Sequence, residues 1–227
     1  MNSEQKVAAL QALYRIEEAF GKSLDTVCRE GCAWCCTARV AMTTLEGYHI
    51  TAYIKRRGED ARFAQIRKRM TAQRFRPKTT TNGLVDICLA GGDPPAESLE
   101  GDAGTCPLLE ESRCPVYPVR PLACRTMRSR ADCAATGFAD MEDFSVTVST
   151  VLMQYVEHID ADGCSGNFAD IMGLFASEAN RAFYAEGGLP CTENGLVINR
   201  PIPALMIPPE HRRRIQPLLE QIARIRV

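Results

Sequence analysis

Apolar residues recur at three-and-four spacing near the start of the chain, and this period is typical of an amphipathic helix. Ser3, whose hydroxyl can accept a hydrogen bond from a helix N-terminus, precedes the apolar stripe. The stripe comprises Val7, Leu10, Leu13, Tyr14 and Phe20. The pattern therefore predicts a first helix that starts at Ser3 and leads into residues 28–36.

Two more helices are predicted before residue 78. Thr43 followed by Glu46 has the form of a capping box, so a helix should begin there and stop at Gly58, a residue type that favours helix ends. Another helix is predicted over about 59–75, because Pro77 cannot continue it.

The stretch 141–161 fits two periodicities. Residues 144–149 alternate apolar and polar side chains as in a strand, but the helical stripe is longer and favours a helix. The stripe comprises Phe144, Val148, Val151, Leu152, Tyr155, Val156 and Ile159. Further helices are predicted over about 168–184, ending at Gly187, and at the C-terminus, where Pro217 either starts the helix or kinks it.

Residues 79–120 lack both periodicities and are rich in glycine and proline, which predicts loops. So long a stretch without secondary structure is unusual in a compact domain unless something other than packing holds it, and we expect bound metal to do so. The chain is therefore predicted to be mainly α, with a single domain over 1–227. A loop-rich cysteine lobe at about 28–133 forms the core of that domain, and the C-terminal helices of about 141–227 pack on it.

Composition adds little about partners. The chain has 227 residues, of which 45% are hydrophobic and 24% charged, and a formal net charge of -1, so nucleic acid and membranes are not expected partners. The N-terminal segment includes Glu4, Glu17 and Glu18 and lacks the apolar core of a secretory signal. We therefore expect a cytoplasmic protein with reduced thiols. The odd number of cysteines, 11, also excludes a complete set of intramolecular disulfides.

Eight cysteines fall into two short windows, and thiolates are soft ligands for zinc, iron and iron–sulfur clusters. The first window holds Cys28, Cys32, Cys35 and Cys36. The second window holds Cys106, Cys114, Cys124 and Cys133. These eight residues are the predicted metal ligands, and a metal ion or cluster is the predicted partner.

The adjacent pair Cys35 and Cys36 bears on the number of metal atoms. Neighbouring side chains diverge, so both thiolates are hard to place on one tetrahedral ion. The pair therefore favours two metals or a polynuclear cluster. Gly31 gives the backbone the freedom to wrap around such a centre.

Arg120 and Arg125, in the second window, are candidate cofactor-binding residues. Their charge would offset that of several thiolates gathered in one lobe. Ordinary surface ion pairing explains them equally well, and the sequence leaves this choice open. Prolines in the same window stiffen the loop and reduce the entropy that metal binding removes.

The spacing of these residues resembles that of the CxxCxxCC family of YkgJ-type proteins. The resemblance covers roughly residues 28–133. The matching residues are Cys28, Cys32, Cys35, Cys36, the run Cys106-Pro107-Leu108-Leu109, and Cys114, Tyr117, Arg120, Pro121, Cys124 and Arg125, with Cys133 nearest to a further family cysteine. Three residues rather than two separate Cys28 from Cys32, which departs from the family pattern.

Resemblance to that family implies chelation of zinc or iron and leaves the metal open. One branch resembles flagellin lysine methylases that use an iron–sulfur cluster with S-adenosylmethionine, which favours iron. The first window is also similar to the CxxxCxΦC motif of radical S-adenosylmethionine enzymes, with Trp34 as the aromatic residue. Those enzymes alternate strands and helices, however, and this sequence shows no such alternation.

We therefore expect a cysteine-cluster protein that holds an iron–sulfur cluster or iron, with zinc as the alternative metal. A structural zinc module for interaction and a cluster-dependent modifying enzyme remain alternatives; no catalytic residue is predicted, and a protein partner is left open. Cys164 is the substitute eighth ligand for Cys133. Structural or surface roles are expected for the isolated cysteines and the histidines, which are Cys88, Cys191, His49, His158 and His211.

Overall fold

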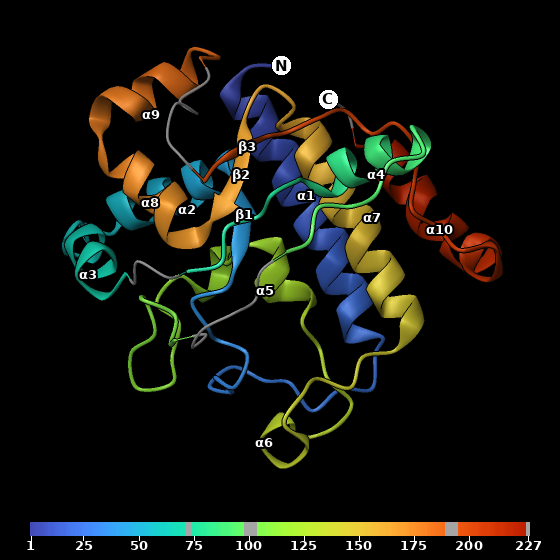
Figure 1. Cartoon of the computed structure of the whole chain (residues 1–227). Coiled ribbons are helices and arrows are strands. Elements are labelled where there is room, and N and C mark those ends of the chain that lie inside the picture. Colours follow the sequence, from blue (N-terminus) through green and yellow to red (C-terminus); the bar gives the residue numbers. More distant parts are fainter. Residues whose placement is uncertain (71–73, 98–103, 189–194, 226–227) are drawn as a thin grey trace.

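The computed structural model describes residues 1–70, 74–97, 104–188 and 195–225, which form helices around a small sheet (Figure 1). The α-helices are α1 (Ser3–Lys22), α2 (Thr44–Arg56), α3 (Ala61–Arg69), α4 (Thr81–Leu89), α5 (Leu122–Thr126), α6 (Cys133–Thr136), α7 (Asp143–Ile159), α8 (Phe168–Ala176), α9 (Glu178–Ala185) and α10 (Arg212–Ala223). The other described elements are the 3-10 helices η1 (Tyr117–Val119) and η2 (Pro209–His211) and the strands β1 (Ala41–Thr43), β2 (Cys164–Asn167) and β3 (Val197–Ile198). The predicted mainly α fold is confirmed. Among the helices described, none combines the length and apolar character needed to cross a bilayer.

Asn2, rather than Ser3, caps helix α1. The Asn2 side chain accepts a hydrogen bond from the Gln5 amide at 2.9 Å, and the Gln5 side chain accepts one from the Asn2 amide at 3.0 Å. This reciprocal pair forms a capping box, so Ser3 is the first helical residue. The helix then leads to the first cysteine window, as predicted.

The capping box predicted at the start of α2 is present. Thr43 Oγ1 accepts a hydrogen bond from the Glu46 amide at 3.2 Å, and Glu46 Oε2 accepts one from the Thr43 amide at 2.9 Å. The chain leaves the helix at Gly58, whose φ of +68° suits a residue without a Cβ. Local sequence therefore identifies both ends of this helix.

The region between α2 and the second cysteine window differs most from the prediction. Helix α3 ends at Arg69, several residues short of its predicted end, and residues 71–73 lie outside the described part of the chain. Helix α4 forms within a stretch predicted to be loop. The Glu157 carboxylate accepts hydrogen bonds from the amides of Thr81 and Asn82, both at 2.7 Å, and so stabilises the N-terminus of α4. That partner is distant in sequence, so the local pattern does not reveal the helix.

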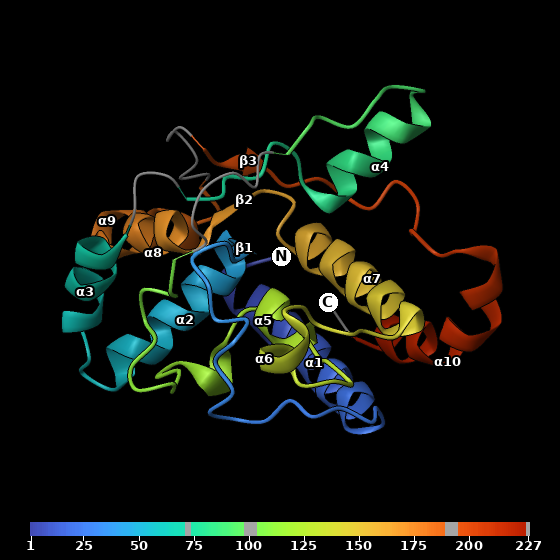
Figure 2. The same ribbon diagram turned by 60° about the horizontal axis from the view of Figure 1, so that its bottom comes forward.

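The long helix predicted over 141–161 is confirmed as α7, which lies beside α1 in both views (Figures 1 and 2). The helix predicted over 168–184 is instead two helices. The backbone is extended at Ser177, whose side chain caps α9 by accepting a hydrogen bond from the Asn180 amide at 3.4 Å. Pro217 lies inside α10 rather than at its start.

The strands form one antiparallel sheet in the order β1-β2-β3, which the sequence does not predict. Met42 of β1 pairs with Gly166 of β2, and Ser165 of β2 pairs with Val197 of β3. Because β1 follows the first cysteine window, the sheet fixes the end of that window against the C-terminal half of the chain.

Two hydrophobic clusters form the core, and both include residues of the second cysteine window. One packs α1, α7 and α10 with Leu122 of α5, and the other packs α2 and α8 against Leu108, Val116 and Val119. Leu108 is fully buried, and Val116 and Leu122 are each 2% exposed. Apolar side chains of this segment therefore anchor it, and the expectation that bound metal also holds the loop stays a prediction.

The buried carboxylate of Asp160 joins the ends of several elements. Its oxygens accept hydrogen bonds from the Thr44 hydroxyl at 2.6 Å, the Leu45 amide at 2.9 Å and the Tyr184 hydroxyl at 2.6 Å. The side-chain amide of Asn199 donates another at 3.1 Å. Burial nevertheless raises the pKa of Asp160 to about 6, against the effect of these donors.

We expect this carboxyl group to give the stability a distinct pH dependence. The folded state holds the proton more tightly than the unfolded chain, so the stabilisation is complete below about pH 4 and is lost as the pH rises through about 6. The free energy of unfolding of the wild-type protein relative to Asp160→Asn should therefore fall by about 3 kcal/mol between about pH 4 and pH 7. Urea titrations of both proteins at each pH measure this difference. The contributions of all other titrating groups are the same in the two proteins and therefore cancel. A difference that is constant over this range would contradict the raised pKa.

Candidate metal centre

Seven of the eight predicted ligands line one cavity of about 280 Å³. They are Cys28, Cys32, Cys35, Cys36, Cys106, Cys114 and Cys124. The cavity lies where the loop before β1 meets the segment that leads into α5. The loop before β1 runs through the lower part of the ribbon in Figure 1. Cys133, at the start of α6, is buried and does not line the cavity. The fold thus brings the two cysteine windows together and leaves one predicted ligand to the side.

Backbone hydrogen bonds join the two windows at two places. At one, the Val27 amide donates to the Ser129 carbonyl at 2.9 Å, and the Ser129 amide donates to the Cys28 sulfur at 3.1 Å. At the other, the Cys106 amide donates to the Cys36 carbonyl at 2.9 Å. The two ends of the first window are therefore held against different parts of the second.

The thiols of Cys35 and Cys36 face each other. A hydrogen bond between them is the main cause that raises the pKa of Cys35 and lowers the pKa of Cys36. The expectation that these adjacent side chains diverge is therefore wrong. Their contact places both residues at the same cavity.

Cys28 links the cavity to Cys133. Burial raises the pKa of the Cys28 thiol, and a hydrogen bond from the Ser129 amide opposes this shift. The thiols of Cys32, Cys35 and Cys133 lie close enough to raise the pKa further. Cys133 is therefore a neighbour of the cysteine site although it lies outside the cavity.

The thiols of the second window form a group of their own. Burial raises the pKa of Cys124, and the thiols of Cys106, Cys114 and Cys35 raise it further. In the described ranges, no three or more Cys, His, Asp or Glu side chains are already arranged as a metal-ligand set. Ligation of a metal would therefore require the thiols, which are free, to rotate toward it.

The arginine signature of the second window forms a compact turn. The Tyr117 carbonyl accepts a hydrogen bond from Arg120 Nη1 at 2.8 Å, and the guanidinium carbon of Arg120 lies 3.8 Å from the centre of the Tyr117 ring. Pro121, which has no amide hydrogen to leave unpaired, precedes α5. Arg125 donates to the Arg120 carbonyl at 2.9 Å and lies 4.0 Å over the ring of Tyr14. The signature residues therefore shape the turn that presents the cysteine of α5.

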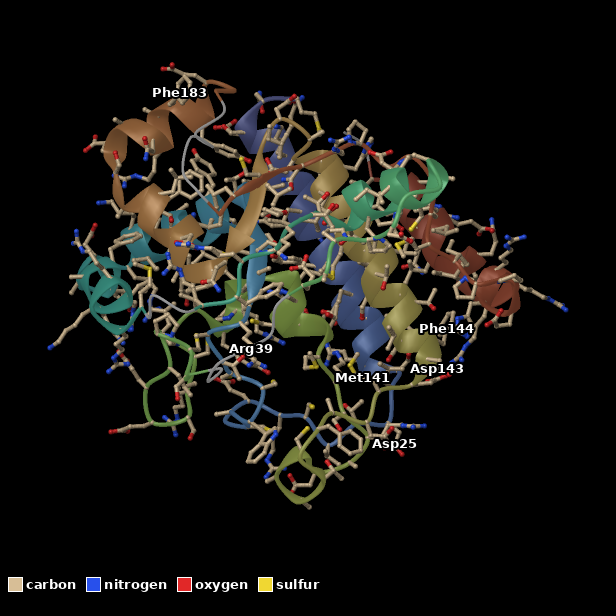
Figure 3. The ribbon with its side chains drawn as sticks, viewed as in Figure 1. Asp25, Arg39, Met141, Asp143, Phe144 and Phe183 are labelled. Atoms are coloured by element: carbon tan, nitrogen blue, oxygen red, sulfur yellow. The ribbon has the colours of Figure 1, made fainter. Side chains whose placement is uncertain are left out.

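Arginines line the cavity together with the thiols, and no Asp or Glu does so among the described lining residues. The arginines are Arg29, Arg39, Arg120, Arg125 and Arg128. Arg39 is labelled in Figure 3, where it lies beside the loops of the cavity. Arg128 pairs with Glu17 at 2.9 Å, whereas Arg120 and Arg125 contact backbone carbonyls and aromatic rings. These contacts show that Arg120 and Arg125 are not engaged in surface ion pairs among the described residues, and their role as cofactor-binding residues stays a prediction.

Glu46 connects the helical core to both windows. Its carboxylate is 3% exposed and accepts hydrogen bonds from the Tyr14 hydroxyl at 2.9 Å and the Leu122 amide at 2.7 Å, besides the capping bond from Thr43. It thereby ties α1 and α2 to the N-terminus of α5, just before Cys124. Sequence reasoning identified Glu46 only as part of a helix cap, because the capping pattern carries no information about partners in other elements.

Other candidate residues lie away from the cavity. Cys164 is fully buried in β2 and disulfide-bonded, so it is not available as a substitute eighth ligand. The expectation of reduced thiols is therefore wrong for Cys164. Cys88 is exposed on α4, and Cys191 lies outside the described residues. Trp34 is 53% exposed and does not line the cavity, although it stands inside the first window.

The histidines also lie apart from the thiols. Burial lowers the pKa of His49 to about 4, and its ring packs edge-on against Tyr14. His158 Nδ1 accepts a backbone amide hydrogen bond at 3.3 Å, and His211 Nδ1 is hydrogen-bonded to the Thr147 hydroxyl at 2.8 Å. These contacts assign the histidines to the packing of the helices.

We expect Glu46→Gln to lower the free energy of unfolding by about 1–3 kcal/mol. The NH2 group of glutamine would replace one carboxylate oxygen and would face a hydrogen-bond donor instead of accepting from it. Urea denaturation measures this change. Glu18→Gln is the matched control, since Glu18 is an exposed carboxylate of α1 that forms an ion pair with Lys22 on the helix surface. The control should change stability by less than about 0.5 kcal/mol. Equal effects of the two substitutions would contradict the connecting role of Glu46.

Comparison with known proteins gives one match. The profile of the CxxCxxCC family, described as "Putative zinc- or iron-chelating domain", matches residues 27–147, which is more than half of the chain and includes all eight predicted ligands. No curated protein and no solved structure matches the chain. The chain therefore belongs to the CxxCxxCC family of zinc- or iron-chelating domains.

Proposed function

We propose that the protein binds iron, as an iron–sulfur cluster or as iron ions, through the thiolates of both cysteine windows. The observation that carries this proposal is the cavity at which two segments far apart in sequence gather seven thiols. Thiolate is a ligand that iron and iron–sulfur clusters share. Cys133 is the proposed eighth ligand, because it neighbours Cys28.

Amide hydrogens around the sulfurs support a thiolate-bound centre. The Ser129 amide donates to the Cys28 sulfur at 3.1 Å. Burial raises the pKa of Cys106, and hydrogen bonds from the amides of Leu108 and Leu109 oppose that shift. Hydrogen bonds to sulfur of this kind stabilise thiolates and tune the reduction potential of a bound cluster.

An accessible centre is favoured over a closed structural zinc site. The second window is anchored by buried Leu108, Val116 and Leu122, so its folding does not depend on metal alone. Cys32 and Cys35 are exposed at the cavity, whereas a structural zinc site is usually a closed shell of four ligands. When bound, an iron or iron–sulfur centre would supply electron transfer.

Arg120 and Arg125 are proposed to balance the charge of the metal-bound thiolates. Both line the cavity, and Arg125 is only 7% exposed. Burial lowers the pKa of Arg125, and the carboxylates of Glu17 and Glu18 oppose this shift. Thiolates gathered around a metal would add negative charge near this guanidinium.

The free thiols of the cavity also bear on the compartment. Thiols persist where glutathione and thioredoxin keep them reduced, and among the described cysteines only Cys164 departs from this state. We therefore propose that the protein acts in the cytoplasm.

Protein purified without oxygen should be coloured and contain iron at a fixed ratio to the chain. Cys36→Ser should lose about half of this metal or more, because it removes a thiolate that contacts Cys35 and lies near three others. Cys88→Ser is the matched control, since Cys88 is an exposed thiol on α4 outside the cavity, and it should keep the wild-type content. Iron and sulfide analysis together with the visible spectrum measures these contents.

Two outcomes would overturn this proposal. A colourless protein with about two zinc ions and no iron would indicate closed structural sites instead. A wild-type chain that binds neither metal would exclude both interpretations.

We expect Arg120→Gln to weaken metal binding about tenfold, because a positive charge near the thiolates is lost, at a cost of about 1.4 kcal/mol. Competition with a chelator measures the affinity. Arg113→Gln is the control, because Arg113 is exposed in the same window and does not line the cavity. Equal affinities of the wild-type protein and Arg120→Gln would show that Arg120 only shapes the turn.

A further inference from the structure

The first cysteine window contacts the second window at two separate places. The chain before Cys28 pairs with Ser129, in the late part of the second window. The chain after Cys36 pairs with its early part, where the Ala38 amide donates to the Gly104 carbonyl at 3.1 Å. The backbone therefore directs the two ends of the first window to different cysteines of the second.

The thiols form two sets that match these two contacts. In each set, one thiol lies within electrostatic range of three others. The first set comprises Cys28 with Cys32, Cys35 and Cys133. The second set comprises Cys36 with Cys106, Cys114 and Cys124. Cys35 contacts Cys36 and also lies within range of Cys124, so the two sets meet at this adjacent pair.

The position of Cys133 does not suit a single centre that includes all eight thiols. Cys133 is buried and does not line the cavity, and its sulfur lies 3.9 Å from the Ala131 carbonyl oxygen. Among the described cysteines that line the cavity, Cys28 is the one whose thiol lies near Cys133. Cys133 can therefore complete a ligand set only on the Cys28 side.

We propose that the eight thiols form two separable metal positions, each with four cysteine ligands, that adjoin at the contact between Cys35 and Cys36. This inference rests on the proposed function and assigns each ligand to one position. Four thiolates complete the shell of a tetrahedral ion or of an iron–sulfur cluster, so two sets of four account for all eight cysteines. The contact between the adjacent cysteines then lies at the boundary, with one residue serving each position.

The two positions are anchored unequally. Ligands of the second set lie on a segment whose Leu108 is fully buried and whose Leu122 is 2% exposed. In the first set, Cys32 is exposed and Cys28 is half-buried, and the neighbouring Val27 is 45% exposed. The first position is therefore the more accessible, and a chelator should remove its metal first.

The test compares Cys32→Ser and Cys114→Ser, one ligand from each set, in full-length protein purified without oxygen. Each variant should keep about half of the wild-type metal, and the double variant should keep none. Cys88→Ser is the control and should keep all of it. A chelator should strip Cys114→Ser, which retains the first position, faster than Cys32→Ser. Far-ultraviolet circular dichroism checks folding, and Cys28→Ser and Cys106→Ser repeat the comparison if either first choice is unfolded.

The outcomes separate this inference from the proposed function. Loss of all metal in one of the folded single variants, or retention of all metal, would overturn the division into two positions and leave metal binding intact. A wild-type protein that carries no metal would overturn the proposed function itself.

Discussion

The arrangement of the site depends on the buried carboxylate of Glu46. A carboxylate inside a protein is costly unless hydrogen-bond donors surround it, and Glu46 finds such donors in Tyr14, Thr43 and Leu122. Thr43 ends the strand that follows the first cysteine window, and Leu122 begins the helix that carries Cys124. One side chain therefore holds both cysteine-bearing segments in place against the helical core. Because any displacement would leave a buried carboxyl group without its hydrogen-bond donors, this arrangement is strongly favoured.

Around this connection, packing and charge prepare the cavity for a soft metal. Burial raises the pKa values of Cys106, Cys114 and Cys124, so metal binding must displace protons from these thiols. Amide hydrogens directed at the sulfurs and arginines at the same cavity favour the negative charge that develops as the protons leave. The cavity thus combines apolar anchoring of the loop with a polar lining that suits thiolates.

Local patterns predicted those elements whose stabilising partners are close in sequence. The apolar stripe of α7 and the capping box formed by Thr43 and Glu46 are of this kind. The prediction failed where the partner is distant: α4 depends on the Glu157 carboxylate, and the sheet pairs strands of only two to four residues from three parts of the chain. The interruption at Ser177 is also hidden within an otherwise continuous apolar pattern.

The same distinction applies to the site. The cysteine spacing and the signature at Arg120 and Arg125 sufficed to recognise the family and the soft-metal chemistry, because ligand type is a property of the residues themselves. Only the tertiary structure shows that seven thiols share a cavity while Cys133 lies on the Cys28 side, and that Glu46 connects the windows. Those relations arise from hydrogen bonds and packing between segments distant in sequence. The spacing of residues along the chain does not show which distant segments come into contact, because the packing of the helical core determines those contacts.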